Sequence, residues 1–149
     1  MREAGWGEDN MKRICVIDGQ GGGIGSTIIK KLKELFGETI EIVALGTNAI
    51  ATSKMLKSGA NRGASGENAI VYMVKRVDII IGPIGIIFAC AMMGEVTPAM
   101  SKAIANSHAK KFLLPLSQEN IKIVGVTPSS LPLLVDELVE VHLKELQCF

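Results

Sequence analysis

Short apolar runs alternate along this chain with longer segments in which apolar residues recur every three or four positions. The short runs predict buried strands at 14–18, 40–45, 77–81, 111–116 and 121–126. The periodic segments predict helices at 26–36, 49–58, 67–76, 98–106 and 131–146. Ile70–Val74, inside the third of these helices, also fits a strand. Strands that alternate with helices indicate an α/β fold with a mostly parallel sheet.

The connections between the predicted strands set the expected topology. Only residues 117–120 separate the fourth strand from the fifth, and four residues cannot carry a parallel crossover, so we expect an antiparallel hairpin there. We therefore predict a Rossmann-like three-layer sandwich whose five-stranded sheet has the order 2-1-3-4-5 and an antiparallel edge strand. Ligands bind such sheets at the carboxyl ends of strands, where the strand order reverses. Here that point faces loops 19–25 and 82–85.

Glycine is concentrated in one loop: five of the 16 glycines lie within residues 19–25, directly after the first predicted strand. Free backbone N–H groups and the dipole of the following helix attract a phosphate there, and missing side chains let it approach. The loop therefore predicts a site for a nucleotide or another phosphorylated metabolite. A tight turn with close helix packing would explain the same glycines without any ligand.

Two known phosphate-binding loops have similar spacings. The pattern G-x-x-x-G-I-G from Gly19 looks like the turn of short-chain dehydrogenases, which makes NAD(P) a candidate cofactor, but Tyr72 lacks the lysine that this class places four residues later. Residues 21–27 look like a P-loop, yet Ser26 stands where the phosphate-binding lysine belongs, which argues against ATP hydrolysis. Asp18 would repel a nearby phosphate. It fits a ribose or metal-bound water contact, or a turn residue that binds backbone N–H groups.

Other polar residues are predicted near the same edge of the sheet. Thr47 and Asn48 follow the second strand, although helix capping alone explains Asn48. Asn61 and Arg62 open a second glycine-rich loop, where an arginine suits phosphate recognition or simply lies in solvent. Glu95, in a turn, is a weaker catalytic candidate, and no nucleophile–base pair is visible. The candidate ligand-binding residues are Asp18, Gly19, Gln20, Gly21, Gly22, Gly23, Gly25, Ser26, Thr27, Thr47, Asn48, Asn61, Arg62, Gly82, Pro83 and Gly85.

Composition narrows the class of partner. The 16 Lys and Arg against 15 Asp and Glu give a net charge of +1, without the basic excess that nucleic acids require. The longest uncharged run, 79–94, contains glycines and a proline and is shorter than the roughly 20 apolar residues of a membrane span. Three cysteines without paired spacing and without a signal-peptide pattern indicate a cytoplasmic protein with reduced thiols. The two histidines have no metal-ligand spacing.

Two segments carry separate expectations. Residues 1–10 are polar and precede Met11, so we expect a disordered tail or sequence upstream of the natural start, with a single domain at 11–149. Residues 86–93 are eight consecutive uncharged, mostly apolar residues, too many for the buried stripe of one helix. We therefore expect part of this segment to contact a second subunit in a homodimer.

Five runs, in this order along residues 11–126, carry a family resemblance: VIDGQGGGIG at 16–25, ALGTNA at 44–49, GANRGA at 59–64, GENA at 66–69 and IGPIGI at 81–86. Together they resemble a bacterial family known as domain of unknown function 3842. The resemblance implies a Rossmann-like protein of about this length, and it carries over no catalytic residue. It also implies that the five motifs belong together, in agreement with their predicted placement on one sheet edge.

These observations leave three functions open. The favoured one is binding of a nucleotide or phosphorylated metabolite at Gly19–Gly25. The alternative is a regulatory or interaction module, without enzymatic activity, that keeps a vestigial glycine loop. A third is a small NAD(P)-dependent reductase.

Overall fold

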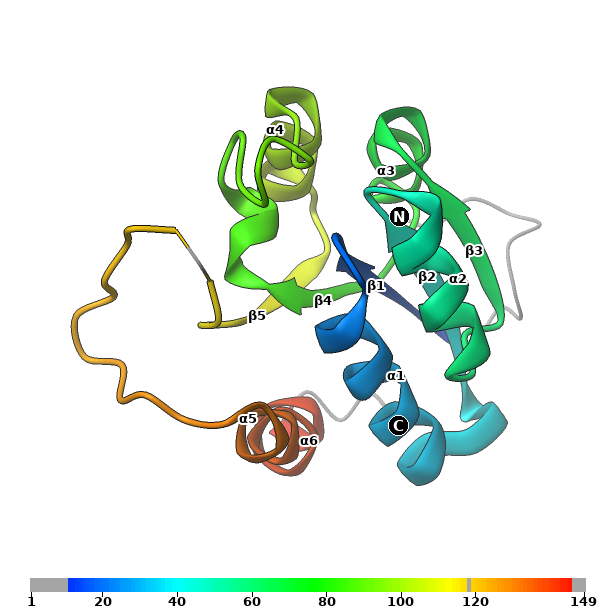
Figure 1. The fold of residues 1–149 in the computed structure, drawn as a ribbon. Coiled ribbons are helices and arrows are strands. Elements are labelled where there is room, and N and C mark those ends of the chain that lie inside the picture. The colour runs from blue at the N-terminus through cyan, green and yellow to red at the C-terminus, as the bar shows by residue number, and fades with distance from the viewer. Residues whose placement is uncertain (1–10, 118, 146–149) are drawn as a thin grey trace.

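A five-stranded parallel sheet lies between two layers of helices in the computed structural model, which describes residues 11–117 and 119–145 (Figure 1). The strands are β1 Lys12–Asp18, β2 Ile40–Gly46, β3 Arg62–Ser65, β4 Ile79–Pro83 and β5 Lys110–Leu114. The α-helices are α1 Gly23–Phe36, α2 Ala49–Lys57, α3 Glu67–Met73, α4 Pro98–Asn106, α5 Leu131–Glu137 and α6 Leu143–Glu145. Shorter helical turns are η1 Gly37–Thr39, η2 Ile84–Ile87 and the π-helical η3 Leu138–His142.

The chain builds the sheet outward from β1 in two directions. The strand order is β3-β2-β1-β4-β5, and each neighbouring pair is parallel. Val16 in the middle of β1 is in register with Ala44 on one side and Ile81 on the other. The order therefore reverses between β1 and β4, at the two strands for which the sequence predicted it.

Burial on both faces explains why the central strands are almost continuously apolar. Helices α1, α2 and α5 cover one face, where Ile28 and Leu32 pack beside Val135. Helices α3 and α4 cover the other face, where Ile70 packs with Ile104. The sheet and its two helical layers thus form the three-layer sandwich that the sequence predicted.

Three local signals in the sequence set helix ends as expected. Asn48 caps α2, since its Oδ1 accepts the Ala51 N–H at 2.8 Å. Thr97 caps α4, since its Oγ1 accepts the Met100 N–H at 3.1 Å, and Pro98 follows at the first helical position. Gly37 ends α1 with a positive φ of 53°.

The predicted antiparallel edge strand at 121–126 is wrong. This segment has no strand, and all of its residues are exposed. It belongs to a long connection that swings away from β5 before it returns to α5 (Figure 1). The fifth strand is instead β3, at the opposite edge beside β2, which the sequence hid because Arg62–Ser65 contains no large apolar residue.

Other boundaries shift by smaller amounts. Helix α3 ends at Met73 rather than at 76, and the predicted last helix contains the π-helical η3. Residues 86–93 form no α-helix: Ile86 is buried, whereas Met93 is 95% exposed. The homodimer expected on this segment stays a prediction. The proposed tail at 1–10 and the end of the last helix at 146 lie outside the described residues.

Within the described part of the chain, none of the helices combines the length and the apolar character needed to cross a membrane.

Candidate functional site

A crevice opens at the carboxyl ends of β1 and β4, where the strand order reverses. Its volume is about 450 Å³. The lining residues come from the glycine loop, from the loop after β4 and from both ends of the connection between β5 and α5: Asp18, Gly19, Gln20, Gly21, Gly22, Gly23, Ile24, Pro83, Gly85, Met92, Leu116, Ser117, Glu119 and Leu131. The two glycine-marked loops therefore face the same cavity, as the sequence suggested.

Asp18 is the charged group at the base of the crevice. It is buried, its Oδ1 accepts the Gly19 N–H at 2.8 Å and its Oδ2 accepts the Gly25 N–H at 2.7 Å. Burial raises the pKa of Asp18, while hydrogen bonds from the N–H groups of Gly25, Gly19 and Ile24 oppose that rise. Asp18 thus acts as the turn residue that the sequence allowed, and its carboxylate already interacts with the N-terminus of α1.

Three glycines of the loop are required by packing. A Cβ on Gly19 would lie 2.5 Å from Thr47 Oγ1, and a Cβ on Gly25 would lie 2.5 Å from Met55 Sδ. Gly22 has a φ of +75°, and its Cβ would lie 2.9 Å from the backbone of Ala51 in α2. These glycines bring the loop, α1 and α2 close together, which is the structural explanation that the sequence left open.

Gly21 and Gly23 differ from the other glycines of the loop. Neither has a positive φ between +20° and +160°, and a Cβ on either would meet no atom within 4 Å. Both residues are exposed and line the crevice. Within the described residues, their backbone N–H groups donate no hydrogen bond. The protein itself therefore gives no packing reason for glycine at these two positions.

Glu95 joins the loop to the end of β2. Its Oε1 accepts hydrogen bonds from Thr47 Oγ1 at 2.6 Å, from the Gln20 N–H at 2.8 Å and from Asn48 Nδ2 at 2.9 Å. Burial would raise the pKa of Glu95, but the bonds from Thr47, Gln20 and Asn48 together lower it below its usual value. An oxygen already bound by three donors suits a structural link better than a catalytic base.

The same region holds backbone conformations that residues other than glycine rarely adopt. Gln20, Cys90, Met92 and Met93 have φ values of 50°, 67°, 58° and 58°. Met92 lines the crevice. Glu95 follows the turn at 90–93 by two residues, and its carboxylate accepts the Gln20 N–H, which connects the turn to the glycine loop. No pattern in the sequence predicts the strained turn at 90–93, because its residues are ordinary apolar ones.

Several sequence candidates lie outside the crevice lining. Asn61 Oδ1 accepts the Ile42 N–H at 2.8 Å, and Arg62 Nη2 donates to Glu41 Oε2 at 2.6 Å, so both belong to the sheet edge at β2. Helix α1 contains Gly25, Ser26 and Thr27, and strand β4 contains Gly82. The Glu95 carboxylate accepts hydrogen bonds from Thr47 and Asn48. The loop itself, with Pro83 and Gly85, remains at the cavity.

The crevice combines an acidic base with apolar walls. Among the described residues of its lining, the charged ones are Asp18 and Glu119, and none is a lysine, arginine or histidine. Met92, Leu116 and Leu131 supply apolar surface to the lining. The described residues contain no group of three or more His, Cys, Asp or Glu side chains that would hold a metal ion.

Comparison with known proteins places the chain in a family. The model of the family described as Domain of unknown function (DUF3842) matches residues 13–147, so the chain belongs to that family. A search of the curated proteins finds no match. One similar solved structure is described as a dodecameric FMN-dependent UbiX-like decarboxylase from Escherichia coli O157:H7, with 14% identity, a TM-score of 0.47 and coverage of 92% of this chain and 94% of that one.

Proposed function

We propose that the crevice binds a nucleotide through its pyrophosphate, with phosphate oxygens on the backbone N–H groups of Gly21 and Gly23. The observation that carries this proposal is the pair of glycines itself. Their N–H groups are unpartnered within the described residues, and the space where their side chains would lie opens into the cavity. Glycine at such positions permits the close approach of a ligand to the backbone.

The charge of the crevice favours a pyrophosphate diester over a terminal phosphate. Rossmann-type loops hold a dinucleotide pyrophosphate with backbone N–H groups, without a lysine. A terminal triphosphate carries more charge and usually requires a P-loop lysine and a magnesium ion. The described lining offers no cation, and the Asp18 carboxylate lies at its base. A dinucleotide is therefore the class of nucleotide that this crevice suits best.

The size of the cavity and its apolar lining support the proposal. Its volume of about 450 Å³ is within the usual range for small-molecule sites, roughly 300–1,000 Å³. A base ring would pack against Met92, Leu116 and Leu131, which form the apolar wall. Ribose hydroxyls would donate to Glu119 in the connection to α5.

A thermal-shift panel of NAD, NADP, FAD, CoA, ATP, GTP and S-adenosylmethionine tests the proposal. A ligand at 100 times its Kd adds about 2.7 kcal/mol, which raises Tm by roughly 5–10 °C in a protein of this size. We expect dinucleotides to raise Tm and ATP and GTP to have little effect. A response confined to NAD or NADP would further support a reductase. No response to any ligand would contradict the proposal and favour the interaction module.

Matched variants connect the response to the loop. Gly23→Val places a branched side chain in the cavity at the first position of α1, and Ala49→Val makes the same kind of change at the first position of α2. Ala49 is exposed and is not part of the crevice lining. We expect Gly23→Val to abolish the ligand-induced rise in Tm and Ala49→Val to preserve it, with both proteins folded. Equal responses of the two variants would place the ligand elsewhere.

A further inference from the structure

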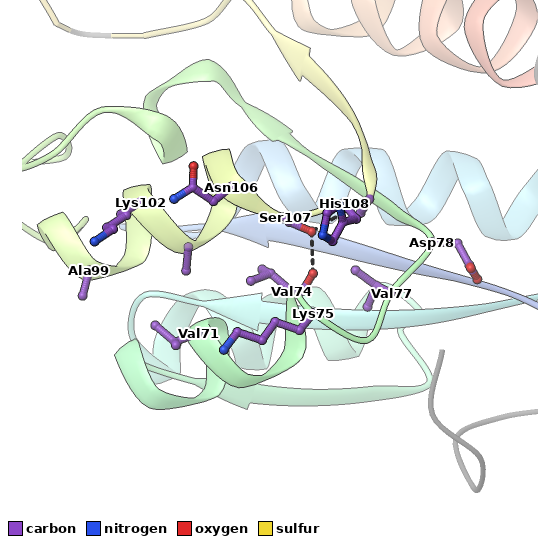
Figure 2. Close-up of a pocket in the computed structure, with 12 residues that line it drawn as sticks. Val71, Val74, Lys75, Val77, Asp78, Ala99, Lys102, Asn106, Ser107 and His108 are labelled. Atoms are coloured by element: carbon purple, nitrogen blue, oxygen red, sulfur yellow. Dashed lines mark hydrogen bonds between the residues drawn. The ribbon is translucent and has the colours of Figure 1, made fainter. Parts of the chain in front are cut away.

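A second cavity lies between α3 and α4, near the amino ends of β4 and β5 (Figure 2). It has a volume of about 790 Å³ and lies beside the residues that precede β4 and β5, far from the glycine loop along each strand. The Ser107 hydroxyl donates to the Val74 carbonyl at 2.5 Å and bridges the ends of the two helices. The interior is formed by small apolar side chains, namely Val71, Val74, Val77, Ala99, Ala103 and Ala109.

Two lysines border this apolar surface from opposite walls. Lys102 reaches from α4 and Lys75 from the end of α3, and Figure 2 shows both amines directed toward the same end of the cavity. Within the described residues, neither lysine forms an ion pair. Asp78 is the acidic residue of the described lining; it lies at the other end in Figure 2, and its Oδ2 accepts the Arg13 N–H at 2.9 Å.

From this arrangement we propose that the cavity binds a small amphipathic anion, an apolar acid whose carboxylate lies between Lys75 and Lys102. The apolar part of the molecule lies over the valine and alanine side chains, which leave the space that a larger residue would fill. A carboxylate between two lysines gains charge-assisted hydrogen bonds from both walls. Asn106, on α4 beside Lys102, is a further polar residue of the lining.

The dimensions favour a small molecule over a peptide helix. The volume lies within the usual range for small-ligand sites, and the lining combines apolar side chains with polar groups, as is typical of such sites. The bond between Ser107 and Val74 joins the two helices between the lysine end and the Asp78 end of the cavity, whereas a docked helix needs a groove that is open along its whole length.

Displacement of the fluorescent anion 1-anilinonaphthalene-8-sulfonate by decanoate tests this proposal on the full chain. We expect decanoate to displace the dye, and acetate and decyltrimethylammonium not to do so at the same concentrations. Lys75→Gln and Lys102→Gln should each weaken decanoate binding roughly two- to fivefold, as expected for partly exposed charge pairs. Ala103→Leu should weaken it by filling the cavity, with circular dichroism as the check that the variant is folded.

Two controls make the result specific. Lys57→Gln removes an exposed lysine at the end of α2, which is not part of this cavity, and should leave decanoate binding unchanged. Gly23→Val, in the other crevice, should also leave it unchanged. Displacement by the cationic detergent as readily as by decanoate would overturn the proposal. Binding that is insensitive to Lys75→Gln, Lys102→Gln and Ala103→Leu in folded protein would overturn it too.

Discussion

The glycine loop predicts opposite stability effects for two alanine substitutions only two residues apart. In Gly25→Ala the new Cβ would lie 2.5 Å from Met55 Sδ and 2.9 Å from Asp18 Cβ. Met55 is fully buried, so its sulfur has little room to move away. In Gly23→Ala the new Cβ meets no atom within 4 Å, and φ is not in the left-handed region.

The expected magnitudes follow from these distances. Overpacking at Gly25 costs roughly 1–3 kcal/mol. Displacement of its N–H from Asp18 weakens a charge-assisted hydrogen bond of 2.7 Å, whose loss costs roughly 1.5–3 kcal/mol. Because the hydrogen bond is weakened rather than lost, and the better helix propensity of alanine returns up to about 1 kcal/mol, we expect a net loss of about 2–4 kcal/mol, in the lower part of the summed range. Gly23→Ala should instead be neutral or stabilise by about 0.4–1 kcal/mol, because alanine restricts the unfolded chain.

Equilibrium urea unfolding followed by far-ultraviolet circular dichroism measures both effects. A change in the midpoint with an unchanged m value reports a change in stability rather than in the unfolded state. The packing account is refuted if Gly25→Ala unfolds within about 0.5 kcal/mol of the wild type. It is equally refuted if Gly23→Ala is destabilised as much as Gly25→Ala.

Three further predictions concern charges and thiols away from the two open glycines. Glu41→Gln should lower the free energy of unfolding by roughly 3–5 kcal/mol in urea, because it removes the carboxylate 2.6 Å from Nε of the fully buried Arg13. Arg62→Gln should lower it by at most about 1 kcal/mol, because the Arg62 side chain, which also pairs with Glu41, is half-exposed. The lowered pKa of Glu95 stabilises the folded state above the pKa of the unfolded chain, roughly 4.3. The stability difference between wild type and Glu95→Gln should therefore be constant near neutral pH and shrink as the pH falls below that value; a difference that grows on acidification would contradict it. Burial raises the pKa of the Cys15 thiol, so iodoacetamide followed by peptide mass mapping should modify Cys15 only in denatured protein.

The sequence was most informative where local chemistry determines the structure. Helix caps at Asn48 and Thr97 act through side chains on their own neighbouring N–H groups, so both could be predicted. The apolar runs of β1, β2 and β4 identify central strands because both of their faces are buried. From these three strands the reversal point, and hence the position of the crevice, follows without any knowledge of distant contacts.

Edges and long-range contacts could not be predicted in the same way. The edge strand β3 is short, and its residues are half-buried or exposed, so it lacks the apolar pattern of a strand. The segment 121–126 has that pattern but no partner strand within the described chain. The glycine-rich surroundings of Arg62 suggested that it binds an anionic ligand. In the structure it binds the carboxylate of Glu41 instead, a residue 21 positions away in the sequence. Which glycines pack and which remain open depends likewise on α2, which no pattern within the loop reveals.

The most direct test of the ligand site is the amide spectrum of the protein labelled with ¹⁵N-glycine, titrated with the dinucleotide that raises Tm most. The chain has 16 glycines, few enough for each cross-peak to be assigned by substitution. A phosphate oxygen on the loop should shift the amide signals of Gly21 and Gly23 most strongly, and those of Gly37 and Gly59, at the far ends of α1 and α2, very little. Saturable binding that leaves the Gly21 and Gly23 signals unchanged would contradict the account.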